Sequence, residues 1–251
     1  MRKFVGQFEV ENKMEGERIT VVTVTHNSED VIVRALSSLH RLKNILIVDN
    51  ASVDSSIRRV RMAIPHAKIF LNPTNEGFGR GANKALKHVE TEYALLVSPD
   101  CVIKNEELEQ LLILADRWEN AALISPILID PNGSWARSHD QDLFSRGGMR
   151  RNRSDEPFPS GNVCAGFVQN AVSLVRMKAV QEIGFYDENI FLFYEDDDLC
   201  MRLRAKGWSL ILSPMVQAEH FPGTSSSGES ESLLSVRYFH MAWSRIYLEQ
   251  K

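Results

Sequence analysis

The chain has 251 residues, of which 43% are hydrophobic, so it can bury a sizeable core in one large domain or two small ones. Its formal net charge of -4 gives no global indication of nucleic-acid binding, and we expect no nucleic-acid partner. Three scattered cysteines form no C-x-x-C pair, which argues against a disulfide framework or a cysteine zinc site.

The first 18 residues contain no apolar region typical of a signal peptide, and we expect them to form an N-terminal extension. No run reaches the roughly 18 apolar residues that a membrane span requires. Together with the cysteine pattern, these features favour a reducing, cytoplasmic location.

Short β-branched runs alternate with helical patterns through the first half of the chain. The spacing predicts strands over 19–26, 44–50, 67–72 and 93–99, and helices over 28–39, 54–64, 79–90 and 105–119. Asp54 is the expected N-cap of the second helix. This order predicts an α/β fold with a mainly parallel sheet covered by helices on both faces. Such sheets bind ligands beyond the carboxyl ends of their strands.

The pattern changes from Pro131 to Pro159, a stretch rich in Gly, Ser, Asn, Pro and Arg. A loop this long inside a compact domain is usually functional or mobile. Its arginines, for which the sequence suggests no role, are Arg137, Arg146, Arg150, Arg151 and Arg153. Regular structure is expected to resume near Val163.

The last 20 residues have the pattern of a terminal helix that carries aromatic side chains. The residues concerned are Tyr238, Phe239, Trp243, Ile246 and Tyr247, which lie among Arg237, His240, Arg245 and Lys251. Helices that lie on membrane surfaces combine such residues, so peripheral membrane contact is one interpretation. We favour the other, packing of the aromatic residues into the core.

Two acidic residues lie at the ends of predicted strands: Asp49 ends ILIVD, and Asp100 follows LLVSP. Either one alone is explained by the preference of aspartate for turns and caps. Both are expected at the same edge of one parallel sheet, which is the edge where ligands bind.

A glycine-rich stretch, NEGFGRGANKAL, precedes the third predicted helix and contains Gly77, Gly79 and Gly81. Glycine allows a close approach to a ligand, and a helix N-terminus favours phosphate. The spacing is neither G-x-G-x-x-G nor a P-loop. An anion-facing loop and a purely structural one both remain open.

Four consecutive acids, Glu195 to Asp198, follow the apolar run IFLFY. The sequence EDDDLCMRLRAKGW predicts a helix with acids in its first turn and Gly207 as its terminator, and the helix dipole stabilises such acids. Capping explains two or three acids but not their place beside the core. A partly buried carboxylate has a raised pKa and suits a general base.

His220, in QAEHFPG, follows a strand-like run. A structural role and a role as a ligand beside a diphosphate or a metal ion are both open.

Six stretches occur together in one order: VVTVTHNSEDVIVRALSSL, ILIVDNASVDSS, NEGFGRGANKAL, LLVSPDCVI, GFYDENIFLFYEDDDLCMRLRAKGW and AEHFPGTS. From Ile19 to the terminal helix the chain resembles the family 2 inverting glycosyltransferases, most closely their bacterial rhamnosyltransferase-like branch. The resemblance implies a single GT-A domain over 19–251, with a nucleotide-sugar-binding half over 19–130 and an acceptor-binding, catalytic half over 131–251.

The resemblance implies a nucleoside-diphosphate sugar donor, based on dTDP or UDP, with dTDP-rhamnose favoured. The residues that it places at the donor are Thr25, Asn27, Asp49, Arg80, Asn83 and Ser98. Among them, Asp49 would contact the base or ribose, while Arg80 and Asn83 would lie along the diphosphate. The implied acceptor is a glycan or a lipid-linked sugar of a bacterial polysaccharide or glycoconjugate.

The resemblance also implies Mg²⁺ or Mn²⁺, with Asp100 and His220 at the metal. Asp196 would be the general base and Glu195 would help orient the site. These residue types suit an inverting displacement, in which one carboxylate takes the acceptor proton and a hard cation with oxygen ligands offsets charge on the leaving diphosphate.

This sequence departs from the family pattern at three places, one of which is the Arg-rich loop, which matches no part of that pattern. Ser98-Pro99-Asp100 stands where the branch commonly has Asn-Pro-Asp, which leaves one obvious carboxylate for the metal. Asn170 stands at a glycine position, where we expect a left-handed turn that asparagine tolerates.

Two other functions are compatible with an α/β nucleotide-binding fold. A nucleotidyltransferase would normally have a glycine- and Lys/Arg-rich loop after the first strand, but TVTHNSED contains no glycine. A non-catalytic nucleotide- or glycan-binding protein would not need Asp100, Asp196 and His220 together.

Overall fold

A computed structural model describes residues 17–135, 138–140, 159–221, 224–225 and 231–251. The predicted N-terminal extension, apart from its last residues, and nearly all of the Arg-rich loop lie outside the described residues. Among the described residues, no helix is long and apolar enough to cross a membrane.

The centre of the molecule is a nine-stranded sheet. Its strands are β1 (Ile19–Thr25), β2 (Ile45–Asn50), β3 (Lys68–Asn72), β4 (Tyr93–Val97), β5 (Cys101–Ile103), β6 (Ala121–Ile129), β8 (Val163–Ala165), β10 (Val172–Arg176) and β11 (Ser209–His220). A separate two-stranded sheet pairs β7 (His139–Asp140) with β9 (Phe167–Val168).

The strand order β3-β2-β1-β4-β10-β6-β11-β5 places the switch in strand order between the parallel strands β1 and β4. β1, β2, β3, β4, β6 and β11 run in one direction, while β5, β8 and β10 run against them. The predicted mainly parallel sheet is therefore confirmed. Because β10 is antiparallel to β4, the residues before β10 reach the same edge as the carboxyl end of β4.

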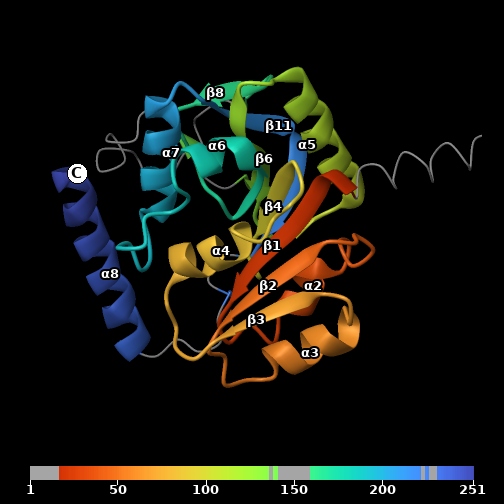
Figure 1. Cartoon of the computed structure of the whole chain (residues 1–251), viewed down its shortest axis with the longest axis vertical. Coiled ribbons are helices and arrows are strands. Elements are labelled where there is room, and N and C mark those ends of the chain that lie inside the picture. Colours follow the sequence, from red (N-terminus) through yellow and green to blue (C-terminus); the bar gives the residue numbers. More distant parts are fainter. Residues whose placement is uncertain (1–16, 136–137, 141–158, 222–223, 226–230) are drawn as a thin grey trace, which may run out of the picture.

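Helices cover both faces of the sheet, as predicted (Figure 1). The helices are α2 (Ile32–Leu36), α3 (Ser56–Ala63), α4 (Phe78–Leu86), α5 (Asn105–Arg117), α6 (Met177–Glu182), α7 (Glu195–Ala205) and α8 (Glu231–Gln250). One apolar core lies under α2, α3 and α5, and a second lies under α4, α6 and α7. Helix α8 lies outside these layers, alongside α7 (Figure 1).

Two helix predictions need correction. The helix expected over 28–39 is regular only in α2, because the hydroxyl of Ser37 donates to the Arg34 carbonyl and the chain continues in tight turns. Helix α3 begins at Ser56 and its N-cap position is Ser55. Asp54 still provides a hydrogen-bond acceptor at the start of the helix, since its Oδ1 accepts the Ser56 backbone N–H at 2.9 Å.

Candidate active site

A cavity of about 620 Å³ opens at the carboxyl edge of the sheet, beside the switch between β1 and β4. Thr25 ends β1, Ser98 and Asp100 follow β4, Asn170 precedes β10, and His220 ends β11. The turn before α7 and one side of α8 complete the lining. Ligands of open α/β sheets bind at such an edge, so this cavity is the candidate active site.

Helix α7 begins abruptly after an aromatic turn. Phe193 and Tyr194 have φ values of +64° and +65°, in the left-handed region that bulky residues rarely adopt. The acids Glu195, Asp196 and Asp197 then line the cavity from the first turn of α7. Strained backbone of this kind is concentrated at functional sites.

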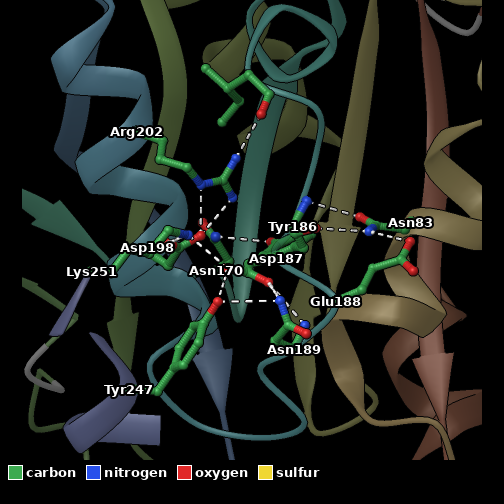
Figure 2. Close-up of polar contacts among 11 residues, drawn as sticks. Asn83, Asn170, Tyr186, Asp187, Glu188, Asn189, Asp198, Arg202, Tyr247 and Lys251 are labelled. Carbon is green, nitrogen blue, oxygen red and sulfur yellow. Dashed lines mark hydrogen bonds and ion pairs between the residues drawn. The ribbon is translucent and has the colours of Figure 1, made fainter. Parts of the chain in front are cut away.

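Asp198, the fourth acid, is fully buried and does not line the cavity. One oxygen accepts from Arg202 at 2.7 Å and the other from Lys251 at 2.6 Å (Figure 2). Asp198 is therefore held by two cations, and helix-dipole capping alone does not account for it. Glu195, Asp196 and Asp197 therefore line the cavity, whereas Asp198 binds Arg202 and Lys251.

Asp196 is held by the segment that precedes β10. The backbone N–H of Asn170 donates to Asp196 Oδ2 at 3.1 Å. The Asn170 side chain in turn donates to the Tyr186 hydroxyl at 3.0 Å and accepts from Ser173 at 3.1 Å. Burial, with the nearby negative charges of Asp196 and Glu195, holds the pKa of Tyr186 well above 10, so this hydroxyl stays protonated.

The left-handed turn expected at Asn170 is wrong, since this residue is not among those with positive φ. Its buried side chain is instead fixed by hydrogen bonds to its neighbours. The functional part that sequence reasoning missed is the link from Tyr186 through Asn170 to Asp196. The departure from the family pattern at position 170 was the available signal.

Asp100 and His220 come together across β5 and β11, where His220 pairs with Cys101. Asp100 Oδ2 lies 3.8 Å from His220 Nε2, and the buried Nδ1 atom of His220 has no hydrogen-bond partner among the described residues. This separation is too long for a direct hydrogen bond, and the two groups are close enough to contribute to one metal site.

Burial raises the pKa of Asp100, although a charged His220 and the Ser225 hydroxyl act in the opposite direction. The Cys101 thiol lies within 4.8 Å of both groups. Burial and the charge of Asp100 raise the pKa of Cys101 well above 9, so it remains a thiol. The donor set is thus one carboxylate oxygen and one imidazole nitrogen, which fits Mg²⁺ or Mn²⁺ better than a thiolate-seeking metal.

The structure brings Thr25, Asn27 and Asp49 together at the ends of β1 and β2, where Thr25 and Asp49 are register partners. Thr25 lines the cavity, and within the part of the chain that the structure describes its buried hydroxyl has no hydrogen-bond partner. Asn27 and Asp49 bind the adjacent turn: Asn27 Oδ1 accepts from the Val53 N–H and Asp49 accepts from the Ser52 N–H. Ser98 lines the same cavity.

Arg80 and Asn83 do not line the cavity. Arg80 is exposed and donates to the Glu188 carbonyl at 2.7 Å. Asn83 is buried, donates to the Tyr186 carbonyl at 2.9 Å and accepts from the Tyr186 N–H at 2.9 Å (Figure 2). In this structure both residues fasten α4 to the segment before α7, and their contact with a diphosphate stays a prediction.

Two glycines of the stretch NEGFGRGANKAL allow neighbouring parts of the chain to pack closely. Gly77 has a φ of +84°, and a Cβ there would lie 2.1 Å from the Phe191 carbonyl oxygen. A Cβ at Gly81 would lie 2.8 Å from Val24 of β1. Gly77 also lines the cavity, so its close approach to Phe191 helps to shape the site.

Helix α8 contradicts the expected packing of its aromatic residues into the core. Tyr238 and Phe239 are 67% and 63% exposed, and Ile246 is 56% exposed. The side of α8 that faces the domain is mainly polar. This inner stripe consists of Arg237, His240, Ser244, Tyr247 and Leu248, together with Lys251 just beyond the helix.

The glycosyl transferase family 2 model matches residues 20–183, which is more than half of the chain. The chain belongs to this family.

Two curated relatives extend the comparison. The chain is 25% identical over 250 residues to an N-acetylglucosaminyl-diphospho-decaprenol L-rhamnosyltransferase of Mycobacterium tuberculosis, covering 88% of this chain and 81% of that protein. It is 24% identical to a dTDP-rhamnosyl transferase of Shigella flexneri, covering 83% of this chain and 70% of that protein. These likenesses support the rhamnosyltransferase-like branch.

Among solved structures, a mannosyltransferase of Pyrobaculum calidifontis in complex with GDP-Man and Mn²⁺ aligns with a TM-score of 0.61 and 14% identity, covering 93% of this chain and 64% of that one. At this identity the likeness concerns the fold alone. The fold is GT-A, as the family resemblance implied.

Proposed function

We propose that this protein is an inverting glycosyltransferase that moves a sugar from a nucleoside diphosphate to an acceptor hydroxyl. The observation that carries the proposal is that one cavity is lined both by the carboxylate of Asp196 and by the Asp100–His220 pair. An inverting displacement needs a base at the acceptor and compensation of charge at the leaving group, on opposite sides of the anomeric carbon.

Asp196 is the group that accepts the acceptor proton in this proposal. The N–H of Asn170 holds one of its oxygens at 3.1 Å, which orients the carboxylate at the first turn of α7. Phe191, Phe193 and Tyr194 line the cavity directly before the acids, where their rings restrict water around the reacting groups.

Asp100 and His220 would hold Mg²⁺ or Mn²⁺. When bound, such a cation offsets the negative charge that develops on the leaving diphosphate. The proximity of Asp100 Oδ2 and His220 Nε2, which lie 3.8 Å apart, supports a site of this kind. With a single carboxylate among these two ligands, we expect modest metal affinity.

The favoured donor is dTDP-rhamnose. The support comes from the curated relatives, whose names describe rhamnosyl transfer and in one case a dTDP donor. A UDP-hexose donor is the alternative, because contacts to the base hardly separate thymine from uracil. A relative that binds nucleotide or glycan without turnover is the third possibility.

The proposed acceptor is a glycan or a lipid-linked sugar of a bacterial surface polysaccharide or glycoconjugate. One relative acts, by its name, on a diphospho-decaprenol acceptor. The exposed apolar side chains of α8 support peripheral contact with a membrane that carries such a lipid. They are Leu234, Val236, Tyr238, Phe239, Met241, Trp243 and Ile246.

Liposome sedimentation tests the membrane contact. Binding to anionic vesicles that is lost in the Phe239→Glu/Trp243→Glu double variant supports it. Absence of binding, or dimerisation through the same face in light scattering, contradicts it.

A thermal-shift panel of dTDP, UDP and GDP with and without Mn²⁺, followed by a turnover assay with dTDP-rhamnose, tests the enzyme proposal. A ligand that binds only the folded state raises the melting temperature. We expect dTDP or UDP with Mn²⁺ to give the largest rise, and sugar release or transfer to follow. The largest rise with GDP would contradict the donor, and binding without turnover would favour the non-catalytic alternative.

A further inference from the structure

Helix α8 is fixed to the catalytic half of the domain by its polar inner stripe. Lys251 donates to Asp187 at 2.7 Å and to Asp198 at 2.6 Å, and the Tyr247 hydroxyl donates to Asp187 at 3.0 Å (Figure 2). Further along, the Ser244 hydroxyl donates to the Leu192 carbonyl at 2.9 Å. The end of α8 is therefore anchored on the acid-bearing helix α7 and on the segment before it.

The anchored helix also reaches the candidate active site. The His240 ring stacks on Phe191 with a centroid separation of 4.3 Å, and Phe191 lines the cavity. From α8 itself, Arg237 and Met241 line the cavity. Because the contacts of Ser244, Tyr247 and Lys251 set the position of the helix, they also set the position of Arg237.

The charge of the cavity makes Arg237 unusual. Four carboxylates line it, from Asp100, Glu195, Asp196 and Asp197. Among the described lining residues, Arg237 alone is an arginine or lysine. A diphosphate ligand adds further negative charge. Its binding therefore requires positive groups that offset its repulsion by these carboxylates.

The guanidinium of Arg237 is available to a ligand. No hydrogen bond or ion pair links it to any residue in the part of the chain that the structure describes. Two other cationic side chains at the C-terminal end of α8 form ion pairs. Arg245 pairs with Glu249 at 2.8 Å, and Lys251 pairs with Asp187 and Asp198. A guanidinium has a planar fork of donors that matches two phosphate oxygens.

We propose that Arg237 binds a diphosphate group in this cavity, either that of the nucleotide donor or that of a lipid-linked acceptor. The proposal rests on the proposed function and deepens it, since it assigns an anion-binding residue to α8. It also explains why a helix outside the two cores is fastened so closely to α7.

Isothermal titration calorimetry on the full chain tests this inference. The variants are Arg237→Met, which keeps the length of the side chain, and Arg237→Lys, which keeps the charge. Arg245→Met is the matched control, because it removes an arginine that lies two turns along the same helix and outside the cavity lining. The probes are dTDP with Mn²⁺ and farnesyl diphosphate with farnesyl monophosphate as its comparison.

We expect Arg237→Met to weaken binding of at least one diphosphate probe about 10- to 100-fold, the usual effect of losing charge-assisted hydrogen bonds. Arg237→Lys should retain part of the affinity and Arg245→Met nearly all of it. A loss confined to dTDP assigns Arg237 to the donor, and a loss confined to farnesyl diphosphate assigns it to the acceptor.

Unchanged affinity for both probes in Arg237→Met, with unchanged circular dichroism, would overturn this inference but not the proposed function. If the wild-type protein bound no nucleotide with Mn²⁺ and turned over no sugar nucleotide, the proposed function would fall with it. An equal loss in Arg237→Met and Arg245→Met would likewise contradict a specific contact.

Discussion

The backbone N–H of Asn170 points to a carboxylate oxygen of Asp196 at 3.1 Å, and it does so from the turn that precedes β10, a strand antiparallel to both of its neighbours. The Asn170 side chain is locked between the hydroxyls of Tyr186 and Ser173. A buried network therefore fixes the direction of the proposed general base, which is what preorganisation of a catalytic group requires.

This network predicts the behaviour of Tyr186→Phe. The change leaves an amide donor of Asn170 without its partner in a buried site, which costs about 1–3 kcal/mol of unfolding free energy. We expect kcat to fall several-fold while affinity for the nucleotide stays unchanged. Steady-state kinetics with urea denaturation measures both. Loss of nucleotide binding in proportion to kcat would contradict a positioning role for this network.

The close approach of Gly77 to Phe191 predicts that Gly77→Ala damages the site. The new Cβ would lie 2.1 Å from the Phe191 carbonyl oxygen, in a residue whose φ of +84° already disfavours a side chain. Gly133→Ala is the matched control, since its φ is +82° but nothing lies within 4 Å of the added Cβ.

We expect Gly133→Ala to cost about 1 kcal/mol, from backbone strain alone. Gly77→Ala should cost more and also reduce kcat, because the turn before Glu195 must move. Thermal denaturation and kinetics of the two variants decide this. Equal losses of stability with normal activity would show that the contact with Phe191 is unimportant.

Asp187 should make the attachment of α8 sensitive to acid. Burial favours a higher pKa for its carboxyl, but hydrogen bonds from Lys251, the Asn189 N–H and Tyr247 lower the pKa from 3.8 to about 2. Because the folded-state pKa lies below the unfolded one, this stabilisation is complete above about pH 5 and is lost as the pH falls from about 4 toward 2.

The variant that tests this is Asp187→Asn. Its difference from the wild type in unfolding free energy should be constant above pH 5 and should shrink between pH 4 and about 2. Urea denaturation across this range measures the difference. A difference that stays constant down to the acid limit would argue that Asp187 gains nothing from its charge.

Asp100→Ala should abolish the effect of Mn²⁺ on nucleotide binding. The variant removes the carboxylate of the Asp100–His220 pair, and imidazole alone is a weak ligand for hard cations. Calorimetry with dTDP and Mn²⁺ should show weaker binding, and EDTA should remove the activity of the wild type. Full activity in EDTA would remove the metal from the mechanism.

Much of the first half of the chain could be predicted, because its strands and helices follow local patterns. β-branched runs predicted β1 to β4, and amphipathic spacing predicted α5. Acids after strands predicted Asp100 at the cavity, since parallel strands end at one edge of a sheet.

The rest depends on contacts between distant parts of the chain. The antiparallel β10 brings Asn170 to Asp196, and α8 brings Lys251 to Asp198. No local sequence pattern marks Asn170 or Lys251 as a partner of these acids. Because apolar side chains are usually buried, the sequence predicts core packing for the aromatic residues of α8, whereas in the structure the polar stripe faces inward.

Turnover by Asp196→Asn tests the account most directly. Asparagine keeps the size of the side chain but cannot accept a proton, and general-base catalysis contributes about 10²–10⁴-fold. Asp198→Asn, which breaks the ion pairs with Arg202 and Lys251, should instead lower the melting temperature and reduce kcat much less. We predict a fall in kcat of about 10²–10⁴-fold for Asp196→Asn with nearly unchanged nucleotide affinity. Near-normal turnover in Asp196→Asn, or equal losses of kcat in the two variants, would contradict the assignment of Asp196 as the base.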